Sequence, residues 1–249
     1  MVDVTYHGTV ALVELNRDVT NALSPDLIGA LAETLEKVAA APEVRAVVLS
    51  STNDKFFSIG WDIPQLYDLP VESFRGFYEA FNRTCMTLYT LPKPTVAGLR
   101  GHAVAGGCIL ALCCDYRVMA EGHKLMGLNE IKLGVPVPYA ADCILQSIVG
   151  SRIARDIVES GEFYEVEVSF AKGLVDEVVP RERVTARAME RAKTLGAMPS
   201  EAYAGIKANR VEMVEARITA GWEEKQREFL EIWYTEEPRK RLREAIEKF

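Results

Sequence analysis

Short apolar segments alternate with amphipathic helical patterns along the chain, and this alternation constrains the fold more than any other feature. Residues 44–50 (VRAVVLS) and 94–99 (PTVAGL) are continuous apolar runs, which are typical of strands buried on both faces of a parallel sheet. Apolar residues at helical spacing follow Ser24-Pro25 and recur over 71–91. Strands that alternate with helices are joined by right-handed crossovers, so we expect an α/β fold.

The ends of the chain differ from this pattern. Residues 2–6 and 9–15 predict a hairpin with a turn at His7-Gly8. From about Arg181 onward almost every segment predicts helix, and this region contains bulky apolar residues: Trp222, Phe229, Leu230, Trp233, Leu242, Ile246 and Phe249. Such residues pack either on the chain's own core or on neighbouring subunits, and a charged helical layer with apolar anchors slightly favours the second. We therefore expect a core over residues 1–195 and a helical oligomerisation region over 196–249.

The composition argues against several classes of partner. The net charge is −7, from 29 Lys and Arg against 36 Asp and Glu, which is not the basic footprint of a nucleic-acid-binding protein. No apolar run approaches the roughly 18 residues of a membrane span. The first residues (MVDVTY) resemble neither a signal sequence nor a transit peptide, so we expect the protein in the cytoplasm.

Neither the cysteines nor the histidines are spaced as metal ligands. The five cysteines, which include no C-x-x-C pair, are Cys85, Cys108, Cys113, Cys114 and Cys143. Most of them lie in apolar runs, so we expect free buried thiols. The three histidines are scattered, and we expect no metal site.

Two glycine-containing turns connect strand and helix patterns. The first is FFSIGWD (56–62), and the second is GHAVAGGCIL (101–110). Glycine allows a sharp turn and a close approach of the backbone to a ligand. Two such turns at neighbouring strand ends can direct two N–H donors at one oxygen, as in an oxyanion hole. The alternative is a pair of ordinary turns that use glycine for steric reasons.

Four segments, in this order and spacing, resemble the crotonase superfamily, which is also called the enoyl-CoA hydratase/isomerase family. They are FFSIGWDI (56–63), AGLRGHAVAGGCILALCCDYRVM (97–119), GLNEIKLGVPVP (127–138) and AKGLVDEVVP (171–180). The resemblance covers essentially the whole chain. It implies a crotonase-like spiral of ββα units that carries an acyl-CoA site, with a C-terminal helical trimerisation region. It also implies a homotrimer or a dimer of trimers, and no cofactor, because coenzyme A is part of the substrate.

The resemblance also implies roles for individual residues. The backbone N–H groups of Trp61 and Gly106 would bind the thioester oxygen of an acyl-CoA and stabilise an enolate, while the Trp61 side chain walls the acyl pocket. Hydratases of this family use two carboxylates. Three residues beyond Gly106 this chain has Ile109, which cannot transfer a proton, whereas the second carboxylate is retained as Glu130.

One carboxylate suffices to move a double bond, because the same base can take a proton from C2 and return it to C4. The segment around Glu130 is similar to the Δ3,Δ2-enoyl-CoA isomerase branch, which acts in fatty acid β-oxidation. Burial in an apolar pocket would raise the pKa of Glu130 toward neutrality. Three alternatives remain: a hydratase with an unrecognised second acid, another enolate-forming reaction, and a non-catalytic acyl-CoA-binding protein.

Further residues are expected to bind the substrate. The resemblance places Ser58, Ile59 and Gly60 beside the adenine and assigns Arg17 to the phosphates of coenzyme A. Gly107, Ile109, Leu66 and Tyr139 are expected around the acyl group, although Tyr139 fits the core equally well. Asp62 is expected to cap the turn after Trp61, and Asp115 to be structural.

Overall fold

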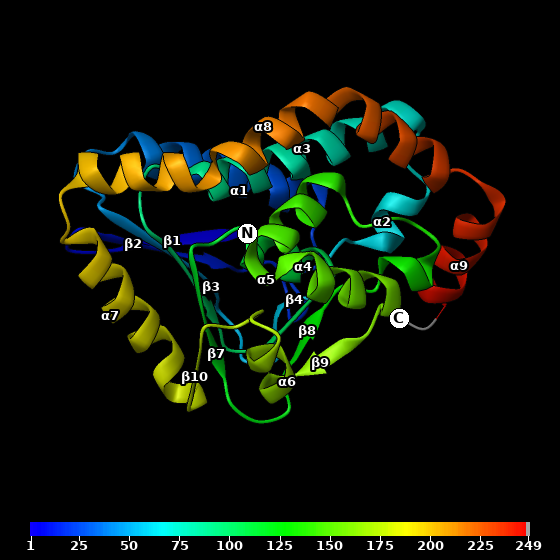
Figure 1. Cartoon of the computed structure of the whole chain (residues 1–249). Coiled ribbons are helices and arrows are strands. Elements are labelled where there is room, and N and C mark those ends of the chain that lie inside the picture. Colours follow the sequence, from blue (N-terminus) through cyan, green and yellow to red (C-terminus); the bar gives the residue numbers. More distant parts are fainter. Residues whose placement is uncertain (248–249) are drawn as a thin grey trace.

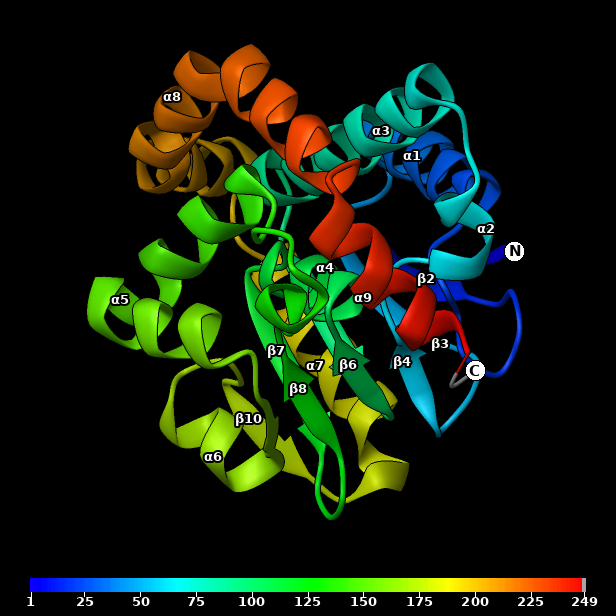
Figure 2. The ribbon, with the colours of Figure 1, turned by 90° about the vertical axis from the view of Figure 1, so that its right-hand side faces the viewer.

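The computed structural model describes residues 1–247, in which helices surround two β-sheets (Figures 1 and 2). The larger sheet contains, in spatial order, β1 (Val2–His7), β2 (Val10–Leu15), β3 (Ala46–Ser51), β5 (Thr95–Leu99), β7 (Tyr116–Ala120) and β10 (Glu177–Val179). Strands β1 and β2 form the predicted antiparallel hairpin, and every other neighbouring pair is parallel. The α/β prediction is confirmed.

The sequence did not predict the strands of the smaller sheet. It contains β4 (Phe56–Ser58), β6 (His102–Val104), β8 (Leu125–Gly127) and β9 (Phe163–Glu165), each of three residues. Strands β4, β6 and β8 follow β3, β5 and β7 along the chain. Helices α2 and α4 come directly after β4 and β6, and α5 comes after β8 and the 3₁₀ turn Glu130–Leu133. The chain therefore winds through successive ββα units, as the resemblance implied.

The helices match the predicted pattern, with differences at their ends. They are α1 (Pro25–Ala40), α2 (Ile63–Tyr67), α3 (Val71–Thr90), α4 (Gly106–Leu112), α5 (Tyr139–Ser160), α6 (Val166–Ala171), α7 (Val184–Gly196), α8 (Ser200–Trp233) and α9 (Glu236–Ile246), with two 3₁₀ turns, η1 (Glu130–Leu133) and η2 (Arg181–Arg183). Ser24 caps α1 by accepting a hydrogen bond from the Leu27 N–H. Helix α5 is kinked at Gly150, where φ is +79°.

The central strands of the larger sheet, β2, β3, β5 and β7, are buried on both faces, as their apolar residues predict. On one face Val48 and Val96 pack with Ala188 and Ala192 of α7. On the other face, alternate residues such as Val47 and the apolar sides of α1 and α3 form the main core. The small side chains of α7 allow this helix to lie close to the sheet.

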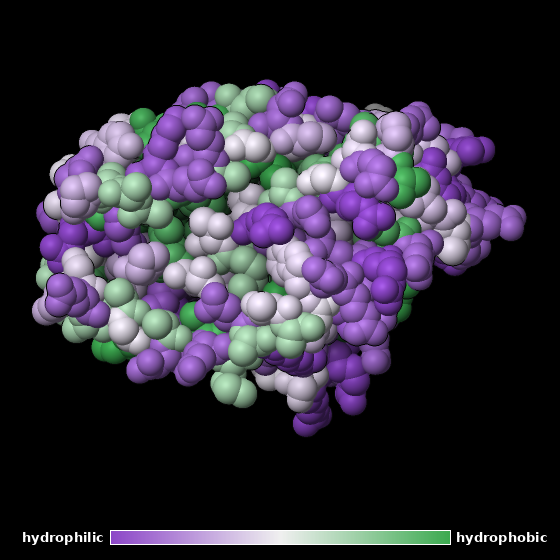
Figure 3. Space-filling model, turned by 90° about the horizontal axis from the view of Figure 1, so that it is seen from above, coloured by the Kyte–Doolittle hydropathy of each residue, from purple (hydrophilic) through white to green (hydrophobic). Residues whose placement is uncertain are grey.

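The C-terminal helices pack on their own chain. Phe229, Leu230, Trp233 and Leu242 are at most 4% exposed within this single chain. Helix α8 lies against α3 and α5, and α9, which carries Leu242, lies against α2 and η1. The prediction that these four residues pack on a neighbouring subunit is therefore wrong. Trp222 and Ile246 are half-buried, and Phe249 lies outside the described residues. Seen from above, the face that carries α8 is mostly hydrophilic, with hydrophobic residues in the hollow between its helices (Figure 3).

Three further observations concern the described residues as a group. All five cysteines are free and buried, as predicted. Within residues 1–247, no helix combines the length and apolar character needed to cross a membrane. Over the same residues, no group of three or more His, Cys, Asp or Glu side chains is arranged to hold a metal ion.

Candidate active site

A largely apolar cavity of about 320 Å³ lies where the smaller sheet meets the C-terminal helices. Its walls come from six parts of the chain: Phe56, Ile59, Trp61, Ile63, Val104, Ala105, Gly106, Asn129, Glu130, Leu133, Val135, Pro138, Phe163, Trp233 and Ala245. Glu130 is the only carboxylate among these described residues. A cavity of this kind, apolar with a few polar groups, is suited to a small ligand or part of a larger one.

The two glycine turns meet at this cavity, in contact with each other. Gly60 has a φ of +93°, and a Cβ added to it would lie 2.8 Å from the Gly106 nitrogen. A Cβ on Gly106 would lie 3.0 Å from Cδ1 of Trp61. The glycines are therefore required because the turns approach each other so closely.

This contact places two main-chain donors at one cavity. Trp61 and Gly106 both line it, and within residues 1–247 neither N–H donates a hydrogen bond. Gly106 is the first residue of α4, so its N–H has no partner inside the helix. Unpaired main-chain N–H groups are uncommon in folded proteins, and a pair of them at one cavity is suited to binding an oxygen.

Glu130 lies in the same cavity on the 3₁₀ turn η1, which Gly134 follows and caps with a φ of +78°. The side chain is only 7% exposed, and its Oε2 has no hydrogen-bond partner within the described residues. Burial raises the pKa of Glu130 to about 7, although the main-chain N–H groups of Glu130 and Asn129 act in the opposite direction. A surface glutamate is thereby excluded, and the carboxyl group has the pKa of an effective acid and base near neutral pH.

Comparison with known proteins identifies the fold around this site. A model of the family described as enoyl-CoA hydratase/isomerase matches residues 5–249. The chain belongs to this family. The structure superimposes on the crystal structure of human mitochondrial Δ3-Δ2-enoyl-CoA isomerase with a TM-score of 0.96 and 27% identity, covering 99% of this chain and 97% of that one.

Curated relatives in the enoyl-CoA hydratase/isomerase family carry both names. Mouse mitochondrial enoyl-CoA delta isomerase 1 is 33% identical over 180 residues, which are 72% of this chain and 62% of the relative. A putative enoyl-CoA hydratase from Thermus thermophilus is 38% identical over 192 residues, which are 76% of this chain and 73% of the relative. The chain thus spans less than two thirds of the mouse isomerase that it matches.

The position where the resemblance places the hydratases' additional carboxylate is apolar in this member of the enoyl-CoA hydratase/isomerase family. Ile109 is 1% exposed and belongs to the main core. Its N–H donates to the Ala105 carbonyl within the first turn of α4. Ile109 does not line the cavity itself.

Ser58 and Gly60 belong to the first glycine turn and Gly107 to the second, and none of the three lines the cavity. Ser58 is fully buried, donates its hydroxyl hydrogen to the Asn21 carbonyl and accepts a hydrogen bond from the Gly60 N–H. A Cβ on Gly107 would lie 2.3 Å from the Ser58 carbonyl oxygen, so α4 can pack here only with glycine. Ile59, in contrast, lines the cavity.

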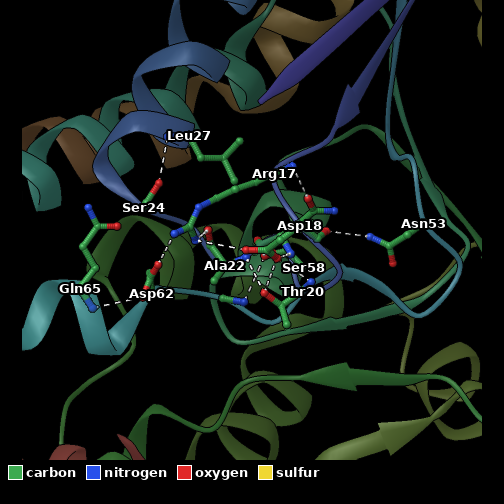
Figure 4. A network of polar contacts seen from close by, with 12 residues as sticks. Arg17, Asp18, Thr20, Ala22, Ser24, Leu27, Asn53, Ser58, Asp62 and Gln65 are labelled. Atoms are coloured by element: carbon green, nitrogen blue, oxygen red, sulfur yellow. Dashed lines mark hydrogen bonds and ion pairs between the residues drawn. The ribbon is translucent and has the colours of Figure 1, made fainter. Parts of the chain in front are cut away.

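Three other residues expected at the substrate lie elsewhere. Leu66 belongs to α2 and is fully buried in the main core. Tyr139 faces a separate small cavity next to Trp222. The guanidinium of Arg17, which was expected to face phosphates, forms an ion pair with Asp62 at 2.6 Å (Figure 4). Asp62 also caps α2 by accepting from the Gln65 N–H, as predicted.

The sequence did not identify several of the cavity's walls. Asn129 lines the cavity, and its buried Oδ1 has no hydrogen-bond partner within the described residues. Its position directly before Glu130 in the sequence is a signal that could have identified it. Phe163, Trp233 and Ala245 reach the cavity only through packing between distant segments. No local spacing signals such a contribution.

Proposed function

We propose that the chain catalyses the conversion of 3-enoyl-CoA to 2-enoyl-CoA, with Glu130 as the single acid and base. The observation that supports this most directly is one buried carboxylate, with a pKa of about 7, in a cavity that also contains the two unpaired N–H groups of Trp61 and Gly106. The names of the mouse relative and of the human structure, both enoyl-CoA isomerases, describe a reaction of this kind. No cofactor is proposed, because coenzyme A enters and leaves as part of the substrate.

In the proposed mechanism, the ionised Glu130 takes a proton from C2 of the substrate. The C–H electron pair forms a dienolate, and its negative charge on the thioester oxygen is stabilised by the Trp61 and Gly106 N–H groups. Protonated Glu130 then returns the proton to C4, and the double bond moves to C2–C3. Each donor contributes roughly 2.7–4 kcal/mol of transition-state stabilisation in comparable sites.

The apolar cavity supports isomerisation over hydration. Adding water to a 2-enoyl thioester requires a group that activates the water as well as one that transfers a proton to C2. Among the described residues, the cavity offers no carboxylate besides Glu130. Hydration or another enolate-forming reaction remains the second candidate, since the Thermus thermophilus relative is named a putative hydratase.

One set of assays separates these candidates. Wild type and Glu130→Gln are given 3-hexenoyl-CoA and 2-hexenoyl-CoA in separate reactions. Isomerisation requires conversion of the 3-enoyl thioester, negligible water addition to the 2-enoyl thioester, and a loss of roughly 10²–10⁴-fold in the variant. Rapid hydration would support the second candidate. Binding of both thioesters without turnover would instead support a non-catalytic acyl-CoA-binding protein.

We also propose that the chain assembles as a homotrimer or a dimer of trimers. Exposed apolar side chains on α8, Ile206 at 69% and Met213 at 78%, support contact with another copy. A mass corresponding to one chain in solution would contradict this assembly.

A further inference from the structure

The loop between β2 and α1 runs alongside the turn that carries Trp61. Main-chain hydrogen bonds join the two segments on both sides of that residue. The Leu23 N–H donates to the Gly60 carbonyl at 2.7 Å, and the Asp62 N–H donates to the Leu23 carbonyl at 3.1 Å. The peptide N–H of Trp61 lies between these bonds and has no partner within residues 1–247, so the loop fixes the peptides around a free donor.

Arg17 adds a charged connection between the same two segments (Figure 4). One guanidinium nitrogen, Nη2, lies 2.6 Å from Oδ2 of Asp62, and the other, Nη1, donates to the Ala22 carbonyl at 2.7 Å. The side chains of Arg17 and Asp62 are 24% and 13% exposed, so water screens this pair only partly. Charge-assisted hydrogen bonds of this length are stronger and more directional than neutral ones.

The second oxygen of Asp62 is also engaged. Oδ1 accepts a hydrogen bond from the Gln65 N–H at 3.1 Å and so fixes the start of α2. Asp62 is thereby held from the loop side and from the helix side at once. Asn21, with a φ of +46° and no exposed surface, donates to the Phe57 carbonyl and holds the other end of the turn.

The Arg17–Asp62 ion pair restricts the orientation of the peptide group that joins Gly60 to Trp61. The Trp61 N–H belongs to the peptide that joins Gly60 to Trp61, and glycine alone places little restriction on that peptide. An oxyanion donor must be held within a fraction of an ångström of its productive position, and a displacement of 1 Å can cost roughly 10²-fold in rate. Arg17 forms its ion pair with Asp62, the residue directly after Trp61, and so restricts the main chain next to this donor.

We propose that Arg17 is a positioning residue, whose bonds to Asp62 and Ala22 orient the Trp61 N–H toward the substrate's thioester oxygen. This inference rests on the proposed function, because it assigns that N–H to an oxyanion hole. It replaces the expectation that Arg17 binds the phosphates of coenzyme A. The Asp62 carboxylate and the Ala22 carbonyl lie 2.6 and 2.7 Å from the guanidinium, and the Asp18 carboxylate lies 3.8 Å from it. All three acceptors belong to the protein.

The kinetic test compares Arg17→Ala, Arg17→Lys and Asp62→Asn with a matched control. Arg187 and Glu177 form an ion pair of the same 2.6 Å length, with 34% and 25% exposed side chains, away from the cavity. Arg187→Ala therefore reports the general cost of losing such a pair. For Arg17→Ala we expect kcat on 3-hexenoyl-CoA to fall roughly 10- to 100-fold, with the KM and the Kd of free coenzyme A nearly unchanged.

The kcat values of the other two variants should differ from each other. Arg17→Lys should recover only part of kcat, because an ammonium group cannot reproduce the fork of two guanidinium bonds. Asp62→Asn keeps an oxygen for the Gln65 N–H but loses the charge, so its kcat should fall as in Arg17→Ala. A raised Kd for coenzyme A with unchanged kcat would assign Arg17 to phosphate binding. A lowered Tm alone, as expected for Arg187→Ala, would assign it to stability; either result overturns the proposal.

A spectroscopic measurement tests the inference without turnover. Hexanoyl-CoA labelled with ¹³C at the thioester carbonyl cannot be isomerised, and its carbonyl signal shifts when hydrogen-bond donors polarise the bond. Bound to wild type it should show this shift, and bound to Arg17→Ala the shift should be smaller. If wild type polarises the carbonyl but does not isomerise 3-enoyl-CoA, the proposed function fails while the inference stands. An equal shift in both proteins would overturn the inference.

Discussion

The indole of Trp61 meets the ring of Phe81 edge-on, with 5.3 Å between the ring centroids and 87° between the planes. Phe77, Tyr78 and Phe229 surround the same indole in similar edge-to-face contacts. Such contacts stabilise a single side-chain position. Because Trp61 also lines the cavity, its fixed indole limits the space available to a bound acyl group.

Replacing the Trp61 side chain should change substrate selectivity more than chemistry, since the proposed mechanism uses only its main-chain N–H. For Trp61→Ala we expect kcat/KM to increase for long 3-enoyl chains relative to short ones. Stability should fall by about 3–5 kcal/mol, because the indole leaves a cavity. The measurement is kcat/KM across a series of chain lengths, with Trp61→Phe as the milder variant. Loss of turnover at every chain length would contradict this prediction.

The rate of the proposed isomerisation should depend on the ionisation of Glu130. Its pKa is raised to about 7 by burial, and only the ionised form can accept the proton from C2. We therefore expect kcat/KM to fall about tenfold for each pH unit well below pH 7, and to level off above it. A pH–rate profile checks this. A rate that stays constant between pH 5 and 8 would exclude Glu130 as the base.

The same raised pKa predicts how stability changes with pH. The folded protein holds the Glu130 proton more tightly than the unfolded chain, whose carboxyl has the ordinary value of 4.5. This contribution to stability is present at low pH and is lost as pH rises from 4.5 to about 7. Glu130→Gln should therefore be more stable than wild type at pH 8, by up to about 3 kcal/mol, and similar at pH 4. Urea unfolding at both pH values, with exposed Glu201→Gln as control, measures this difference.

The surroundings of Gly107 and Gly205 predict contrasting effects of replacing each with alanine. In Gly107→Ala the new Cβ would lie 2.3 Å from the Ser58 carbonyl oxygen, a contact that the main chain must relieve by moving. We expect a loss of about 1–3 kcal/mol or more. At Gly205, inside α8, nothing lies within 4 Å of an added Cβ, so alanine should stabilise the protein by about 0.5–1 kcal/mol. Equal effects of the two substitutions on Tm would contradict the close packing of α4 on β4.

Asp115 should be important for stability, as its position before β7 suggested. Its side chain is 8% exposed and pairs with Lys207, which is 2% exposed, and with Arg210. Burial raises the pKa of Asp115, but the two cations outweigh this and leave it below its usual value. Asp115→Ala would leave Lys207 buried without its partner and should cost about 3–5 kcal/mol. The exposed Asp156→Ala serves as control, and a Tm equal to that control would contradict this role.

The parts of the structure that the sequence predicted are those with local signals. The strands that end at Ser51 and Leu99 have continuous apolar runs, and Ser24-Pro25 marks the start of α1. Glu130 was found through its motif. The three-residue strands of the smaller sheet are too short to show a period, and the contributions of Trp233 and Ala245 to the cavity depend on packing between distant segments. The partner of Arg17 was missed for the same reason: it lies 45 positions along the chain, and no pattern joins the two.

The cavity wall includes Ala245, near one end of the chain, and Phe56, in its first quarter. A partly synthesised chain that had already folded through residue 200 would contain Glu130 and both glycine turns, but it would lack the Trp233 indole. Its glutamate would then be less buried, so its pKa would be raised less than in the complete fold. Activity in this protein should therefore begin only after helices α8 and α9 have folded over the site.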